Sequence, residues 1–166
     1  EIYLTDLIHI ASTQNKTIKS IMLNDSSEGL GVNDRSQLAK LEKIIRDQIN
    51  HDLLIQGVTI IDPETSYIDQ DVKISEDTTI YPNTHIKEGS IIGNNCIIGP
   101  DCSIKGSNIG NNCVITSSSI EYSQIYDEVQ IGPYSHIRKD SILGKNVKIG
   151  NYGEIKNSSI GQNSKS

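Results

Sequence analysis

An aliphatic residue returns at every sixth position through most of the chain beyond its first third, and this period constrains the fold more than any other feature. A few steps near the middle and one at the end are shortened to five residues. A period of six fits neither an amphipathic helix nor a free-standing strand. It is typical of a parallel β-helix built from hexapeptides. The aliphatic positions are Ile68, Ile74, Ile80, Ile86, Ile92, Ile98, Ile104, Ile109, Ile115, Ile120, Ile125, Ile131, Ile137, Leu143, Ile149, Ile155 and Ile160.

The fourth residue after each aliphatic position is often small or β-branched, which matches the geometry of such a coil. Three hexapeptides form one triangular coil of about 18 residues, usually left-handed, and each side pairs with the neighbouring coils about 4.8 Å away. The aliphatic side chain points into the prism, and the residue four places later lies at a tight inner corner. One coil cannot bury its core alone, so stacking stabilises it. The corner positions include Val72, Thr78, Thr84, Ser90, Cys96, Cys102, Cys113, Val129, Ser135, Ser141, Val147 and Gly153.

Composition agrees with a narrow prism and argues against several classes of function. The 166 residues are 35% hydrophobic but include no Trp and no Phe, which suits a core filled by isoleucine. The net charge of -6 argues against nucleic-acid binding. No apolar run approaches the roughly 20 residues that span a membrane, and no signal peptide is recognisable, so we expect a cytoplasmic protein. Cys96, Cys102 and Cys113 fall on corner positions and are interpreted as packing residues rather than disulfide or metal ligands.

Residues 1–31 do not follow the six-residue period. Thr5 is placed to cap a short helix, and Lys16–Leu23 has the pattern of a strand. Asn24–Gly31 is polar and contains glycine, so we expect a loop. One helix and one strand cannot bury a core of their own, so this part is interpreted as the tail of an α/β domain. The apolar side of the helix would be Leu7, Ile8 and Ile10.

The next segment predicts a long amphipathic helix. Its N-cap would be Asn33, Asp34 or Ser36, and Gly57 follows it as a stop signal. Roughly 20 residues of helix span about 30 Å, so we expect a stiff arm before the first coil begins at Gly57. Since the chain begins at Glu1 and ends at Ser166 within the repeat, we expect a piece of a longer protein. The apolar stripe is Leu38, Leu41, Ile45, Ile49 and Leu53.

The residues directly after the core aliphatics point outward and form a column on each face. On one face Arg138 and Lys156 are 18 residues apart and should lie one above the other. Two cations at that spacing repel by roughly 3 kcal/mol at an effective dielectric near 20, so the pair could clamp an anion. The alternative is a solvated charged face with Glu121 pairing Arg138, and spacing alone favours it. The column is Asp69, Lys87, Lys105, Glu121, Arg138 and Lys156, and Lys87 with Lys105 obey the same spacing.

Other candidate groups are weaker. Tyr134 and Tyr152 are also 18 apart and should stack at a corner, for which packing is a sufficient reason. The four histidines are scattered, and His85 and His136 lie too far apart in the stack to share a metal ion within one chain. We find no glycine-rich phosphate loop, paired catalytic acids or nucleophile motif.

Five segments fall in order along the chain and together resemble one bacterial enzyme family. The family is the bifunctional UDP-N-acetylglucosamine pyrophosphorylase and glucosamine-1-phosphate N-acetyltransferase. Many acyltransferases share the hexapeptide repeat. Its combination with the GVNDR sequence that begins at Gly31 and with the long amphipathic helix is more specific to this family. The segments are EIYLTD at Glu1, GVNDRSQL at Gly31, GVTIIDP at Gly57, IGPYSHIR at Ile131 and GNYGEIKNSSIG at Gly150.

The resemblance covers the whole chain and implies three parts of a mainly β protein. Residues 1–35 would be the end of an α/β uridyltransferase domain, and residues 36–56 the linker helix. Residues 57–166 would be the first coils of a left-handed parallel β-helix that forms the acetyltransferase domain. Hexapeptide acetyltransferases resemble one another in being trimers, so we expect a homotrimer.

Site residues follow from the resemblance position by position. The Asn of the GVN segment, here Asn33, is implied to bind the catalytic magnesium and the UDP-sugar. The Arg and Lys that bind sugar phosphate in the acetyltransferase site correspond to Arg138 and Lys156, which reverses the preference drawn from spacing. Tyr3 and Thr5 are implied to lie near the uridyltransferase sugar pocket.

The chain also departs from the family pattern. Arg138 is followed by Lys139 and Asp140 where the family often has Pro-Gly, so a stiff turn beside the arginine is missing. The family's Phe is replaced by Tyr134 and Tyr152. The general-base His of the family would follow shortly after Ser166, in a His-Leu-Ser-Tyr-like segment, and the glycine-rich nucleotide loop would precede Glu1.

The implied activity is N-acetylation of glucosamine-1-phosphate by acetyl-CoA, then uridylyl transfer from UTP with Mg²⁺, for cell-wall synthesis. We expect the parent to be an enzyme and residues 1–166 alone to catalyse neither step. Two alternatives remain open: a non-catalytic trimeric scaffold on the same solenoid, and another hexapeptide sugar-nucleotide transferase.

Overall fold

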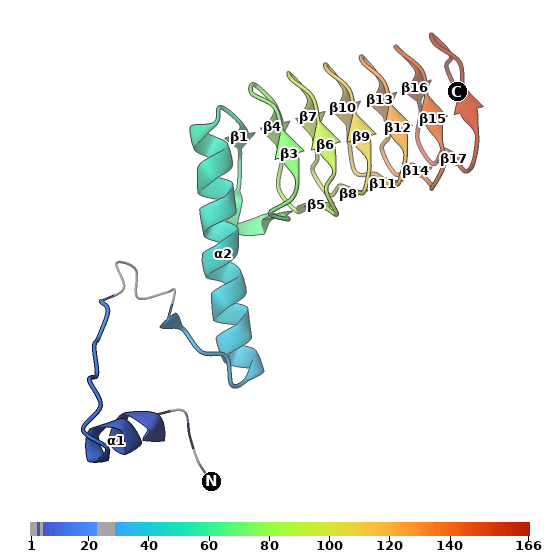
Figure 1. Cartoon of the computed structure of the whole chain (residues 1–166). Helices are drawn as coiled ribbons and strands as arrows, with labels where there is room; N and C mark the ends of the chain where they lie inside the picture. The colour runs from blue at the N-terminus through green and yellow to red at the C-terminus, as the bar shows by residue number, and fades with distance from the viewer. Residues whose placement is uncertain (1–2, 4, 23–28) are drawn as a thin grey trace. The chain divides into compact units, whose positions relative to one another are not determined.

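The computed structural model describes residues 3, 5–22 and 29–166 (Figure 1). The chain divides into two compact units, Glu1–Ala39 and Lys40–Ser166. The first contains helix α1, Asp6–Thr13. Helix α2, Arg35–Ile55, begins in the first unit and continues into the second, where a solenoid of stacked coils follows it.

Helix α1 begins where the sequence indicates, but not through the predicted cap. Thr5 occupies the N-cap position with φ -61° and ψ -25°, and its side chain makes no capping hydrogen bond. Those dihedrals are helical, whereas a capping hydroxyl works from an extended residue. Instead the backbone N–H of Tyr3 donates to Oδ2 of Asp6 at 2.8 Å. The carboxylate of the first helical residue therefore binds the backbone that precedes the helix, and the Thr5 side chain does not act as a cap.

The strand predicted for Lys16–Leu23 is wrong over its described part. Residues 16–22 form no strand, and the described residues of the first unit contain no strand with which they could pair. A strand needs a partner ladder, so an apolar alternating sequence alone does not make one. Ile21 and Met22 are 90% and 93% exposed. Leu23 and most of the loop predicted for Asn24–Gly31 lie outside the described residues.

The N-terminus of α2 has one cap out of three candidates. The backbone N–H of Gln37 donates to Oδ1 of Asp34 at 2.8 Å, and that of Asn33 donates to Oε1 of Gln37 at 2.6 Å. These reciprocal bonds have the character of a capping box, with Asp34 as the N-cap. Asn33 therefore lies one residue before the cap, and capping does not account for its side chain.

The end of α2 confirms Gly57 as the stop signal. The N–H of Val58 donates to the carbonyl of Leu53 at 3.1 Å, and that of Gly57 to the carbonyl of Leu54 at 3.2 Å. This is a Schellman motif, and it requires a left-handed residue where Gly57 has φ +92°. Leu53 and Val58 are both buried, so the motif also joins the helix to the first coil.

Three six-stranded parallel sheets form the sides of the solenoid (Figure 1). Sheet A contains β1 (Thr59–Ile60), β4 (Thr79–Ile80), β7 (Ile97–Ile98), β10 (Val114–Ile115), β13 (Gln130–Ile131) and β16 (Lys148–Ile149). Sheet B contains β2 (Ser66–Ile68), β5 (Thr84–Lys87), β8 (Ser103–Lys105), β11 (Ser119–Glu121), β14 (His136–Ile137) and β17 (Glu154–Ile155). Sheet C contains β3 (Lys73–Ile74), β6 (Ile91–Ile92), β9 (Asn108–Ile109), β12 (Gln124–Ile125), β15 (Ile142–Leu143) and β18 (Ser159–Ile160).

The left-handed parallel β-helix predicted from the six-residue period is confirmed. The aliphatic positions from Ile68 to Ile149 are buried, and Ile155 and Ile160 pack against this core. Ile60, on the side of the prism that precedes Ile68, also belongs to the core. The six-residue period does not include it, because a 3₁₀ turn at Pro63–Thr65 lies between Ile60 and Ile68.

The cysteines confirm the interpretation of the corner positions. Cys96, Cys102 and Cys113 are all free and buried, 0 to 1% exposed. Burial raises the pKa of the Cys102 thiol. Each thiol also donates to a backbone carbonyl of the next coil, as from Cys102 to Ile115 at 3.4 Å. These side chains therefore act as small packing groups.

The five-residue steps leave the stacking of outward residues intact. In a six-residue step a left-handed residue usually lies three places after the core aliphatic, as at Asp140 with φ 62°. In a five-residue step it lies two places after, as at Tyr122 with φ 44° and Asn157 with φ 45°. The turn loses one residue while the strands keep their register. Glu121 therefore still lies beside Lys105, although only 16 residues separate them.

The second unit closes the start of its prism with α2. Ile49 and Leu53 contact the core cluster. Nδ2 of the buried Asn50 donates to the carbonyls of Pro63 at 2.9 Å and Ser66 at 3.2 Å. The helix therefore supplies apolar cover for the first coil and partners for its backbone groups.

Candidate functional site

The charged column on sheet B has the predicted order. Lys87 pairs with Lys105, and Lys105 with Glu121, in the strand register. His136 then pairs with Glu154, and the N–H of Arg138 donates to the carbonyl of Ile155 at 2.8 Å. Arg138 and the following Lys156 therefore lie on adjacent coils, one strand spacing apart.

Arg138 has a carboxylate partner, and it is not the one considered from the sequence. Its Nη1 lies 2.9 Å from Oε1 of Glu154, in a pair whose side chains are 39% and 62% exposed. Glu121, the partner considered from spacing, instead has its Oε1 3.7 Å from Nε2 of His136. The Arg138–Glu154 ion pair and the Glu121–His136 contact therefore both run diagonally across the coils.

Lys156 is the more available cation. Its side chain is exposed, and among the described residues no carboxylate lies within 4.0 Å of its ammonium group. Exposed ion pairs contribute roughly 0 to 1 kcal/mol, so an incoming dianion can compete with Glu154 for Arg138. A phosphate can accept two parallel hydrogen bonds from a guanidinium while an ammonium adds a point charge. The arrangement is chemically suited to hold a phosphate.

Lys105 is bound to Glu88 and Tyr122, so it is less available to an anion than Lys156. This difference distinguishes the pair Lys87 and Lys105 from the pair Arg138 and Lys156, which have the same spacing in the sequence. Nζ of Lys105 lies 3.1 Å from Oε1 of Glu88 and 5.5 Å from the ring centre of Tyr122. The Tyr122 hydroxyl donates to the other oxygen of Glu88. The hydrogen bond from Tyr122 and the ammonium of Lys105 lower the pKa of Glu88, and the bond to Glu88 raises the pKa of Lys105.

Tyr134 and Tyr152 stack as predicted, with ring centres 5.5 Å apart and planes inclined by 21°. The rings are 61% and 76% exposed, so they form a surface platform rather than part of the core. Tyr134 precedes β14 and Tyr152 precedes β17, so each ring stands at the corner where a strand of the Arg138 face begins.

The remaining predicted site residues belong to the first unit, and all three are exposed: Tyr3, Thr5 and Asn33. Among the described residues no group of three His, Cys, Asp or Glu side chains could hold a metal ion. Asn33 supplies one amide oxygen, and the neighbouring Asp34 carboxylate is engaged as the helix cap. Since Mg²⁺ requires near-octahedral oxygen ligation, the described residues alone do not fit a magnesium site. We assign no step to it.

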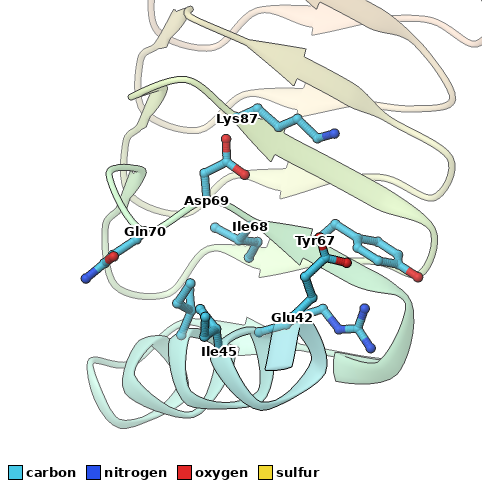
Figure 2. Close-up of a pocket in the computed structure, with 9 residues that line it drawn as sticks. Glu42, Ile45, Tyr67, Ile68, Asp69, Gln70 and Lys87 are labelled. Carbon is cyan, nitrogen blue, oxygen red and sulfur yellow. The ribbon is translucent and has the colours of Figure 1, made fainter. Parts of the chain in front are cut away.

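A cavity of about 390 Å³ lies between α2 and the first coils, and the sequence analysis did not predict it (Figure 2). The guanidinium of Arg46 lies 4.6 Å from the ring centre of Tyr67, which stacks on His85 at 4.6 Å and 5°. Burial and the charge of Lys87 lower the pKa of His85. No local motif marks this cavity, because helix and coil meet only after the chain has folded back. Its polar rim includes Glu42, Asp69, Gln70 and Lys87.

In the part of the chain that the structure describes, neither helix combines the length and the apolar character needed to cross a bilayer.

Comparison with known sequences identifies two kinds of relative. The profile of the EIF2B subunit epsilon LbH domain matches residues 54–155. "Bifunctional protein GlmU" of Shouchella clausii is 44% identical over 99% of this chain and 36% of that protein. The protein of the same name from Listeria monocytogenes is 40% identical over 99% of this chain and 36% of that protein. The chain thus spans about a third of the curated relatives it matches.

Solved structures with a similar backbone are more distant. A mutant of GDP-perosamine N-acetyl transferase from Caulobacter crescentus, in complex with CoA and GDP-perosamine, has a TM-score of 0.49 at 12% identity. The similarity covers 72% of this chain and 62% of that chain. At this distance it bears on neither substrate nor mechanism.

Proposed function

Because this chain belongs to the left-handed β-helix (LbH) domain family and is homologous over nearly its whole length to bifunctional GlmU proteins, we propose that it is a segment of a transferase that makes UDP-N-acetylglucosamine. The parent would acetylate glucosamine-1-phosphate with acetyl-CoA and then transfer a uridylyl group from UTP. The second unit would contribute to the first reaction, and the first unit to the second.

The observation that carries the proposal is the position of Arg138 beside Lys156 on the neighbouring coil. Arg138 and Lys156 are the residues that the resemblance assigns to the sugar phosphate, and the strand register places them on adjacent coils. In the acetyl transfer the substrate amine would attack the thioester carbon, and CoA thiolate would leave. A histidine in a following segment would accept the amine proton. Arg138 and Lys156 would bind and orient the substrate through its phosphate.

The uridylyl transfer would involve the first unit. Asn33, Tyr3 and Thr5 would contact the UDP-sugar, and the magnesium ion would depend on further ligands outside the described residues. The Asn33 side chain suits this role because Asp34, rather than Asn33, caps the helix. We further propose a cytoplasmic homotrimer with acetyltransferase sites between subunits.

The test compares two amine substrates in the full-length parent. Release of CoA thiol should be rapid with glucosamine-1-phosphate and at least about tenfold slower in kcat/KM with glucosamine, since only the former offers a phosphate to Arg138 and Lys156. Equal rates would contradict a phosphate-binding role. No acetylation of either sugar would favour the scaffold alternative, and turnover of a different sugar nucleotide would favour another hexapeptide transferase.

A further inference from the structure

His136 lies beside the Arg138 and Lys156 site and has an unusual environment. Its Nε2 is buried and has no hydrogen-bond partner among the residues that the structure describes, although the imidazole projects from the outer face of sheet B. The nearest carboxylate oxygen, Oε1 of Glu121, is 3.7 Å away. Because the Glu121 carboxylate is the group that faces this nitrogen, His136 can hold that carboxylate in position.

Glu121 has a second possible partner. The register pairs Ile120 with Ile137, which places Glu121 directly beside Arg138 on the next coil. Glu154 already occupies one side of the guanidinium from the coil beyond. If Glu121 turned to the same guanidinium, Arg138 would be held between two carboxylates, and a phosphate would have to displace both.

We propose that His136 is a positioning residue that holds Glu121 away from Arg138, so that one exposed carboxylate remains for a sugar phosphate to displace. The groups facing His136 are Ser119 and Glu121 of β11 and Glu154 of β17. The kinetic consequence rests on the proposed function, whereas the position of Glu121 does not.

The kinetic test uses acetyl transfer by the full-length parent. His136→Ala should raise the KM for glucosamine-1-phosphate about fivefold, the upper range for one exposed charge contact, and leave kcat nearly unchanged. His136→Ala combined with Glu121→Gln should return KM to near the wild-type value, because the competing carboxylate is gone. His136→Arg should also retain the wild-type KM. An unchanged KM in His136→Ala, or a double variant as impaired as the single one, would overturn the proposal.

Two further measurements distinguish the positioning role of His136 from the proposed function on which its kinetic test rests. His85→Ala removes a histidine at the equivalent position three coils earlier on sheet B and should leave KM unchanged. A crystal structure of His136→Ala should show the Glu121 carboxylate within hydrogen-bond distance of the Arg138 guanidinium. Glu121 still pointing away from Arg138 would refute the positioning role whatever the enzyme acetylates. A wild-type parent inactive on glucosamine-1-phosphate would refute the proposed function, and the structural readout would still decide this inference.

Discussion

Nη1 of Arg138 lies 2.9 Å from Oε1 of Glu154, one coil away. Arg138, the residue proposed to bind the sugar phosphate, is therefore paired with a carboxylate of the protein itself when no phosphate is bound. This relationship makes Glu154 a competitor for any phosphate that Arg138 binds. It also holds the guanidinium in one place on a face where the neighbouring turn contains no proline.

Glu154→Gln should lower the KM for glucosamine-1-phosphate about two- to fivefold in the full-length parent, because the phosphate no longer displaces a charged partner. Steady-state kinetics at saturating acetyl-CoA measure this. Glu128→Gln is the matched control, since Glu128 forms a similar ion pair with Lys145 at 2.9 Å elsewhere on the solenoid. A higher KM in Glu154→Gln would mean that the carboxylate orients Arg138 rather than competing for it.

Arg138→Ala should reduce kcat/KM for glucosamine-1-phosphate by about 10- to 100-fold, the range for a lost charge-assisted contact, and leave uridylyl transfer nearly intact. The two activities are measured on the same full-length preparation by release of CoA thiol and of pyrophosphate. Lys139→Ala, at the adjacent exposed lysine, should affect neither. Equal loss of both activities would argue against the assignment of Arg138.

Ile104→Ala should lower the free energy of unfolding by about 2 to 5 kcal/mol, because Ile104 is 0% exposed and its truncation leaves a cavity in the prism. Denaturant unfolding followed by circular dichroism measures the change. Ile97→Ala removes the same atoms from a side chain that is 43% exposed and should cost less than about 1 kcal/mol. Similar losses at the two positions would contradict the inward and outward assignment.

Tyr122→Phe should weaken the dependence of stability on acidic pH. The Tyr122 hydroxyl and Lys105 lower the pKa of Glu88 from its ordinary value of 4.5, so the unfolded chain binds the Glu88 proton more readily than the folded one. The resulting stability is complete above pH 4.5 and is lost as the pH falls through the lower folded pKa. Melting temperatures between about pH 6 and pH 3 should therefore converge for the variant and the wild type as the pH falls.

Tyr126→Phe, at another exposed tyrosine, controls for the loss of a surface hydroxyl in this measurement. A constant difference between Tyr122→Phe and the wild type over the whole range would show that Glu88 is not the titrating group.

The predicted features that failed or stayed ambiguous all depended on a partner. The apolar sequence at Lys16–Met22 has strand character but no strand beside it among the described residues of its unit. The sequence could not distinguish Asn33, Asp34 and Ser36 as N-caps. The structure shows that Asp34 is the cap, because its carboxylate accepts the N–H of Gln37. The domain boundaries at residues 35 and 56 and the roles of Tyr3, Thr5 and Asn33 stay predictions.

The sequence by itself determined the solenoid, because the place of each residue within the six-residue period decides whether it faces the core or the solvent. It also predicted that Arg138 and Lys156 share a column, since three full six-residue steps separate them. Only the tertiary structure decided which charges remain available. Glu88 and Tyr122 are 34 residues apart and meet over Lys105, while Glu154 meets Arg138 and Glu121 meets His136. Such contacts depend on side-chain conformations across neighbouring coils, which a period cannot specify.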